Sequence, residues 1–153
     1  MKTRVLSLAL VVAAALAWSV PARAVSCTIS ATVPVAFGAY DRTSGTALDS
    51  SGSVTYQCGI AGLLDVLTIT MSTGNGTYAS RTMLNGANPM SYNLYTNAGR
   101  TTVWGDGSSG TAVYGPVTLN LLAITVPVYG RIPPGQNVAV GSFSDTIVVT
   151  LNF

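Results

Sequence analysis

Histidine and glutamate are absent from this sequence, and lysine occurs only once, as Lys2. Charged residues make up 8% of the 153 positions, and after residue 24 they are four Arg and five Asp. A Ser-His-Asp triad, a Cys-His pair, a Ser-Lys dyad and a lysine Schiff base each need a residue type that this region does not have. The usual nucleophilic enzymes are therefore excluded for residues 25–153.

An aspartate pair is the acid–base device that these absences leave open. It could act as an aspartic-protease dyad or as the acid and base of a glycosidase. The nearest motif is Asp49-Ser50-Ser51-Gly52, which resembles the Asp-Thr/Ser-Gly protease signature with one inserted residue. Its composition is more typical of a polar turn that opens a strand near Val54. We interpret it as such a turn, and we expect neither an enzyme nor a cofactor.

No segment reaches the roughly 18 uninterrupted apolar residues that a membrane-spanning helix requires. The run Val5 to Trp18 follows Lys2 and Arg4, and it precedes Ala22-Arg23-Ala24, which has small residues at the two positions that a signal peptidase reads. This order predicts a secretory signal peptide over residues 1–24. The protein is then exported through the inner membrane without stable membrane insertion.

Residues 25–153 have the length of one domain. Cleavage after Ala17 is an alternative, because Ala15-Leu16-Ala17 also has small residues at the required positions. Removal of residues 1–24 takes away three of the seven basic residues and leaves four Arg against five Asp. With that charge balance we expect no nucleic-acid partner.

Cysteine is scarce as well, since Cys27 and Cys58 are the only two. In an exported chain a single pair is most simply one disulfide. It closes a loop of about 30 residues, which in the chain-entropy model contributes about 3 to 4 kcal/mol to stability. Two thiols without histidine do not make a zinc site, so we expect no metal.

Alternation of apolar and polar residues recurs along the chain, and no window keeps a helical period of 3.6 residues. The clearest run is C-terminal, and only Asp145 and Val148 break its pattern. Its inward parity carries Phe143, Ile147, Val149, Leu151 and Phe153. Further strands are predicted at Thr28–Phe37, Val54–Cys58, Leu64–Met71, Met90–Thr96, Thr101–Trp104 and Val117–Tyr129.

Turn sequences rich in Gly, Asn and Pro separate these runs, because Gly and Asn accept a positive φ and Pro fixes a negative one. They lie at Gly74–Gly76, Asn85–Pro89, Asn97–Arg100, Gly105–Gly110 and Pro133–Gly135. Six to eight strands at this spacing predict an antiparallel β-sandwich. Cys58 falls on the inward parity of its strand, which is compatible with a buried inter-sheet disulfide.

One loop could carry a binding site. Trp104-Gly105-Asp106-Gly107 would place an aromatic ring and a carboxylate at the surface, as in some sugar or calcium sites, although one carboxylate is too few for a calcium cage. The same string is typical of a Gly-rich hairpin with Trp104 packed at the end of its strand. An adhesin that uses Trp104, Tyr78 or Tyr114 is an alternative, which exposed aromatics would favour.

Several segments, taken together and in order, are similar to the Spore Coat Protein U domain, the family that includes subunits of archaic chaperone-usher pili. They cover nearly all of residues 25–153. The segments are Cys27-Thr28, Ala36–Asp41, Gly52–Cys58, Arg81-Thr82-Met83, Tyr92–Thr96, Trp104–Gly107, Val128–Pro133 and Asp145–Phe153.

The resemblance implies a structural, non-enzymatic protein with an immunoglobulin-like sandwich that, in pilus members, lacks its last strand. A periplasmic chaperone lends a strand to the open groove, and a neighbouring subunit's N-terminal extension later replaces it at an outer-membrane usher. In this sequence the C-terminal run would border the groove, since it leaves no residues for a further strand. Its strand-acceptor and chaperone-contact residues would be Phe143, Ile147, Val149, Leu151 and Phe153.

Pilus members resemble one another in having a donor segment ahead of the first cysteine. Cleavage after Ala24 would leave only two residues before Cys27, which cannot fill a groove. The chain would then accept a strand without donating one, as a terminal subunit, a coat component or a non-polymerising paralogue would. Cleavage after Ala17 would leave Trp18 to Ser26, a poor central strand because it contains Pro21. A self-complete secreted binding module or adhesin is the remaining alternative.

Overall fold

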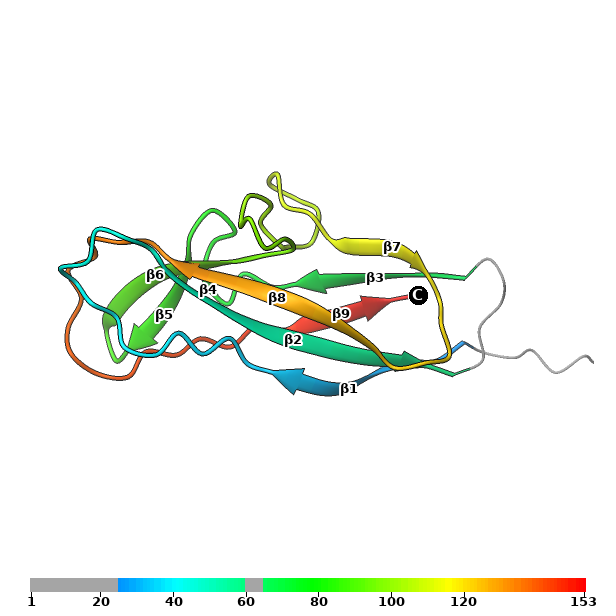
Figure 1. The fold of residues 1–153 in the computed structure, drawn as a ribbon. Helices are drawn as coiled ribbons and strands as arrows, with labels where there is room; N and C mark the ends of the chain where they lie inside the picture. Colours follow the sequence, from blue (N-terminus) through cyan, green and yellow to red (C-terminus); the bar gives the residue numbers. More distant parts are fainter. Residues whose placement is uncertain (1–24, 60–64) are drawn as a thin grey trace, which may run out of the picture.

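The computed structural model describes residues 25–59 and 65–153, whose strands form two antiparallel sheets (Figure 1). In spatial order the larger sheet consists of β1 (Cys27–Val33), β2 (Leu48–Cys58), β8 (Ile124–Ile132), β6 (Asn88–Tyr95), β5 (Arg81–Asn85) and β4 (Asn75–Gly76). The smaller sheet consists of β7 (Tyr114–Thr118), β3 (Val66–Met71) and β9 (Val149–Asn152). The predicted signal peptide lies outside the described residues, as does Leu64. No helix among the described residues is long and apolar enough to cross a membrane.

The core lies between the two sheets and is built from alternate strand positions. From β2 it contains Val54, Tyr56 and Cys58, and from β3 it contains Leu67, Ile69 and Met71. Polar residues of both strands occupy the other parity, so burial follows the alternation that the sequence shows. The predicted antiparallel, immunoglobulin-like sandwich is confirmed.

The predicted disulfide is confirmed, but it does not join the two sheets. Cys27 of β1 and Cys58 of β2 are directly opposed in neighbouring strands, with an S–S distance of 2.07 Å. The bond therefore fixes the edge strand β1 to the rest of the larger sheet.

The sequence predicts one strand over Val117–Tyr129, and this is wrong. The structure divides the region into β7 and β8, which lie in different sheets. Between them the Asn120 side chain accepts a hydrogen bond from the Leu122 amide (2.9 Å), a local turn that competes with the strand. Apolar residues continue through the break, so periodicity does not reveal it.

The region from β4 to the loop after β6 also differs from the prediction. β4 lies within the predicted turn Gly74–Gly76, and β5 has no predicted counterpart. β5 and β6 form a hairpin whose two-residue turn contains Gly86 at a φ of 58°. Thr101–Trp104 is not a strand, because Val103 and Trp104 make only isolated bridges.

Candidate functional site

Each sheet has two edge strands in the described residues, β1 and β4 in the larger sheet and β7 and β9 in the smaller one, and the edges that concern the site are those of β1 and β9. β1 pairs only with β2, and β9 pairs only with β3. Ile29 of β1 is 38% exposed, although Tyr56, directly opposite it in β2, is only 2% exposed. Directly opposed residues face the same side of a sheet. The inner face of β1 is therefore uncovered at this edge.

After β1 the chain passes over the inner face of the larger sheet, in what we call the crossing segment (Val33–Phe37). Gly52 of β2 permits this, because a Cβ there would overlap the backbone of the crossing segment. Gly130 of β8 makes the same room for two side chains of the segment. Phe37 then packs edge-on against Tyr92 of β6, with 6.0 Å between the ring centroids.

The residues before and at the start of β9 lie opposite the crossing segment, and we call them the C-terminal wall (Phe143–Val149). One side of this wall is already bonded to the rest of the fold. Ser144 exchanges two backbone hydrogen bonds with Leu84 of β5 (2.8 and 3.1 Å), and the Val148 carbonyl accepts from the Ser72 amide (2.9 Å). The other side faces the crossing segment.

A groove lies between the crossing segment and the C-terminal wall, which run side by side in Figure 1. It contains two cavities of about 480 and 510 Å³ that share Val35, Met83 and Phe143. No backbone hydrogen bond joins the two walls in the part of the chain that the structure describes. The groove thus combines apolar side chains with backbone that has no neighbouring strand.

Asp145 attaches the C-terminal wall to the larger sheet. Its Oδ1 accepts from the backbone and side-chain nitrogens of Asn75 (both 3.0 Å) and from the Thr146 amide (2.7 Å). Its Oδ2 accepts from the Tyr92 hydroxyl (2.7 Å). Burial, and then the bond to Asp145, raises the pKa of Tyr92, so the phenol remains a donor.

A fully buried guanidinium, that of Arg81, lies in the core close to this cluster. Its nitrogens donate to the Ser72 carbonyl (3.1 and 2.8 Å), to Asn93 Oδ1 (2.7 Å) and to the Trp104 carbonyl (2.6 Å). Burial lowers the pKa of Arg81, and the charge of Asp145 is among the opposing effects. The side chain ties together three segments that border the core.

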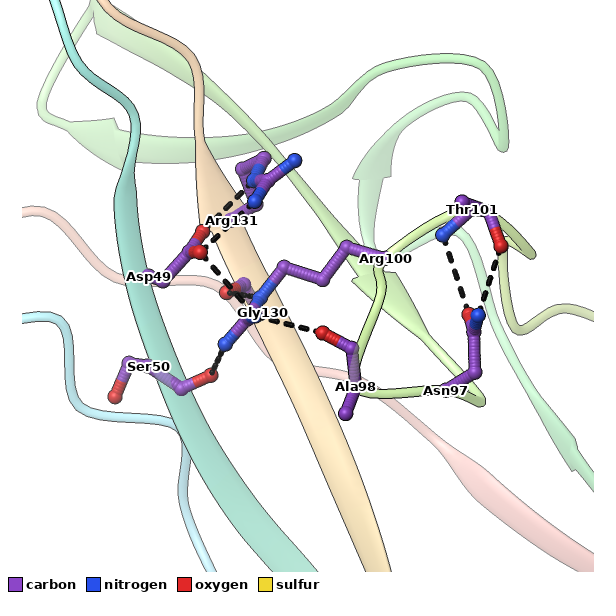
Figure 2. A network of polar contacts seen from close by, with 8 residues as sticks. All are labelled: Asp49, Ser50, Asn97, Ala98, Arg100, Thr101, Gly130 and Arg131. Carbon is purple, nitrogen blue, oxygen red and sulfur yellow. Dashed lines mark hydrogen bonds and ion pairs between the residues drawn. The ribbon is translucent and has the colours of Figure 1, made fainter.

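A second polar network lies around Arg100, in the loop after β6 (Figure 2). Asp49 of β2 and Arg131 of β8 are opposed in register and joined by two hydrogen bonds of 2.7 and 2.9 Å. Arg100, held at a positive φ of 54°, ion-pairs with Asp49 (3.2 Å) and donates to the carbonyls of Ser50 and Gly130. The hydrogen bond from Arg131 is the main reason why the pKa of Asp49 is lowered.

The tetrapeptide Asp49-Ser50-Ser51-Gly52 therefore lies within β2, and the turn predicted there is wrong. Asp49 is a charged residue at the start of this strand, and its charge is balanced by the guanidinium groups of Arg100 and Arg131. This carboxylate is used to fix the loop after β6 to β2 and β8.

The Spore Coat Protein U domain matches residues 12–150. This chain belongs to that family. Protein U of Myxococcus xanthus is 36% identical over 133 residues, which cover 76% of this chain and 70% of Protein U. The expectation of a structural, non-enzymatic protein is confirmed by membership of this family.

A solved structure with the same fold comes from the archaic chaperone-usher Csu pili of Acinetobacter baumannii, namely the CsuC-CsuE chaperone–tip adhesion subunit pre-assembly complex. Its matching chain has a TM-score of 0.55 and 19% sequence identity. The match covers 85% of this chain and 40% of that chain. At this identity the likeness supports the fold alone.

In this Spore Coat Protein U domain, most of the C-terminal residues that are predicted to face inward do so. Of the predicted contact residues, Phe143, Ile147, Val149 and Leu151 are half-buried against the core, whereas Phe153 is 56% exposed. Only Val149–Asn152 is a strand. Asp145 faces inward because it bonds Asn75 and Tyr92, and Val148 is 61% exposed.

The crossing segment, which forms the second wall of the groove, is not among the predicted site residues. The predicted strand Thr28–Phe37 is shorter in the structure, since β1 ends at Val33. Two signals in the sequence point to the crossing: Pro34, which is disfavoured in a continuing strand, and Gly52 and Gly130 inside strands, which indicate close approach of another backbone. Neither signal indicates which segment of the chain lies against these two glycines.

The predicted surface-contact loop is wrong for Trp104. This side chain is fully buried, packs near Tyr114 and donates its indole N–H to the Ile69 carbonyl (2.9 Å). Asp106 is exposed, and its carboxylate accepts from the amide and hydroxyl of Ser108 (2.9 and 2.6 Å), which lowers its pKa. The loop therefore offers no exposed indole for a surface ligand.

Proposed function

We propose that this chain is an exported subunit of a cell-surface pilus or coat-like layer, and that a β-strand from a partner chain fills its groove. The observation that carries the proposal is that β1 and β9 each have a neighbouring strand on one side only, and that the groove lies at their free edges. Such edges are templates for strand addition. Family membership supports the structural role.

The shape and chemistry of the groove suit an extended peptide. A strand beside the C-terminal wall would form main-chain hydrogen bonds and direct every second side chain inward, toward the two cavities. Ile29, Val35 and Ile147 would then lose contact with water. Fully burying one such side chain stabilises a complex by about 1.5–3 kcal/mol, and a chain without the strand is prone to aggregate.

The solved Csu complex is named as a chaperone with a tip adhesion subunit before assembly. By that likeness we take the first occupant of the groove to be a strand of a periplasmic immunoglobulin-like chaperone. A neighbouring subunit would replace this strand at an outer-membrane usher. Because one set of main-chain hydrogen bonds replaces another, the exchange needs no external energy carrier.

Residues 1–24 have the pattern of a signal peptide that is removed on export. Cleavage after Ala24 leaves two residues before Cys27, which is covalently tied to β2. The subunit then accepts a strand but has none to donate, which suits a terminal position or a coat component. N-terminal sequencing of the exported protein should give Val25, whereas a start at Trp18 would contradict this assignment.

The experiment that tests strand acceptance is periplasmic co-expression of the tagged chain with a cognate immunoglobulin-like chaperone, followed by native mass spectrometry. We expect a one-to-one complex and poor recovery without the chaperone. Ile147→Asp places a charge in the groove, and Val148→Asp places one on the exposed side of the same wall. We expect the first variant to lose the complex and the second to keep it.

A well-folded monomer that ignores the chaperone would contradict strand acceptance and favour a self-complete binding module. Equal loss of the complex in both variants would show that the wall contributes only to folding. Circular dichroism of each variant separates misfolding from loss of binding.

A further inference from the structure

The inward side of the C-terminal wall is apolar except at one position. Phe143, Asp145, Ile147 and Val149 alternate along the wall, and all four line the cavity of about 480 Å³. Phe143 also lines the second cavity, of about 510 Å³, together with Met83 and other apolar residues. Asp145 is the next inward residue after Phe143, so it lies beside the junction of the two cavities.

The Asp145 carboxylate is held in place, and its hydrogen bonds are divided unevenly between its two oxygens. Its Oδ1 accepts three, two from Asn75 and one from Thr146, whereas its Oδ2 accepts one, from Tyr92. A carboxylate offers about four acceptor sites over its two oxygens, so Oδ2 is the less occupied oxygen. Gly74 lies against the carboxylate so closely that a Cβ there would overlap it, which limits movement of the side chain on that side. Oδ2 is therefore the oxygen that would meet a donor from an incoming strand.

A polar position in an apolar groove affects the alignment of whatever strand binds there. Because side chains alternate with a period of two, an alternating strand that slips by two residues still presents its apolar face. Apolar contacts alone therefore leave several registers nearly equal. One polar position removes this degeneracy, as a single buried Asn fixes the register of a coiled coil.

We propose that Asp145 sets the register of the incoming strand by requiring a hydrogen-bond donor at the single inward position that faces it. The occupant is then a strand with alternating apolar residues, interrupted once on its inward side by a side chain such as Lys, Arg or Thr. This inference rests on the proposed function of the groove and narrows the chemistry of its partner.

The test uses the full exported chain with its disulfide intact and a series of blocked synthetic peptides. Each peptide has Val at its inward positions and Ser or Lys at its outward positions, with a photoreactive residue at one end. One inward Val is replaced by Thr, which has the same shape but adds a donor, or by Lys, with Met as its apolar control. Affinity is measured by fluorescence anisotropy, and register by mapping the cross-linked residue.

We expect the Thr and Lys peptides to bind about tenfold more tightly than their Val and Met counterparts, the effect of one hydrogen bond to a charged group. Moving the Lys by two residues along the peptide should move the cross-link by two residues along the groove. Asp145→Ala, which removes both acceptor oxygens, should abolish this movement, and Asp145→Asn, which keeps one acceptor oxygen without the charge, should weaken it. The control Thr146→Ala, on the exposed parity of the wall, should keep the movement unchanged.

Cross-links that ignore the position of the Lys in the unmodified chain, or that still follow it in Asp145→Ala, would overturn the inference while leaving strand acceptance standing. Failure of every peptide to bind, the all-Val peptide included, would instead contradict the proposed function. If Asp145→Ala does not fold, Asp145→Asn supplies the comparison, and a cross-link that follows the Lys in Asp145→Asn as closely as in the unmodified chain would overturn the inference.

Discussion

At the scale of single residues, one buried cation joins three parts of the fold. Arg81 donates to acceptors at Ser72 after β3, at Asn93 in β6 and at Trp104. Arg81 lies in one of the segments that resemble the family, but the sequence does not indicate that it is buried. Arginine is almost never fully buried unless its charge is compensated, so an exposed position is the expectation from sequence. The acceptors that surround it come from separate segments, which only the folded chain brings together.

Replacing Arg81 with Met should therefore leave several buried acceptors without a donor. Each such acceptor costs about 1–3 kcal/mol, so we expect the free energy of unfolding to fall by about 3 kcal/mol or more. Arg81→Lys should recover only part of this loss, because one ammonium cannot reach all three acceptors. Urea unfolding measures both variants, and Arg42→Ala, at an exposed arginine with one backbone bond, is the control. Equal effects of Arg81→Met and Arg42→Ala would contradict this role.

The ion pairs of Asp49 predict a dependence of stability on pH. Its pKa is lower in the folded chain than the ordinary value near 3.9, chiefly through the hydrogen bond from Arg131. Its stabilising contribution is therefore complete above about pH 4 and is lost as the pH falls through the lowered pKa. Thermal unfolding of the unmodified chain and of Asp49→Asn should differ at neutral pH and converge in acid. A constant difference across the acid range would contradict this assignment.

At the scale of elements, alternation identified most strands but not the sheets to which they belong. Predicted strands and structure agree well at β3, at β6 and in the second half of β2, where the inward parity is buried. The first half of β2 was predicted to be a turn. The single strand predicted over Val117–Tyr129 is wrong because a two-residue period looks the same in either sheet, and so does not show that the chain changes sheets between β7 and β8. Half of the groove could be predicted: parity indicates which residues of the C-terminal wall face inward, and the resemblance to the Spore Coat Protein U domain implies that they border a groove. The crossing segment could not, because its position depends on contacts with strands distant in the sequence.

The path of the crossing segment makes a specific prediction for Gly52. A Cβ at this position would overlap backbone atoms of Val33 and its neighbours, which cannot rotate aside. We expect Gly52→Ala to destabilise the chain by about 1–3 kcal/mol and to weaken chaperone binding, because one wall of the groove is displaced. Gly45→Ala, where a Cβ meets nothing within 4 Å, should have little effect in the same unfolding and binding measurements. Equal behaviour of the two variants would show that the crossing is not constrained at Gly52.

At the scale of the whole molecule, the two sheets form a sandwich whose seam stays open along one side. The disulfide fixes β1 at one border of the opening, and β9 with the C-terminal wall forms the other. We propose that a strand from another chain lies in this groove and pairs with its backbone.

Amide hydrogen exchange, measured on the refolded, disulfide-intact chain before and after addition of the cognate chaperone, shows whether the groove accepts a strand. We expect the amides of the C-terminal wall and of β9 to gain strong protection in the complex, while β7, at the opposite edge of the smaller sheet, changes little. A stable complex without added protection in Phe143–Asn152 would contradict strand acceptance, because the chaperone would then bind elsewhere.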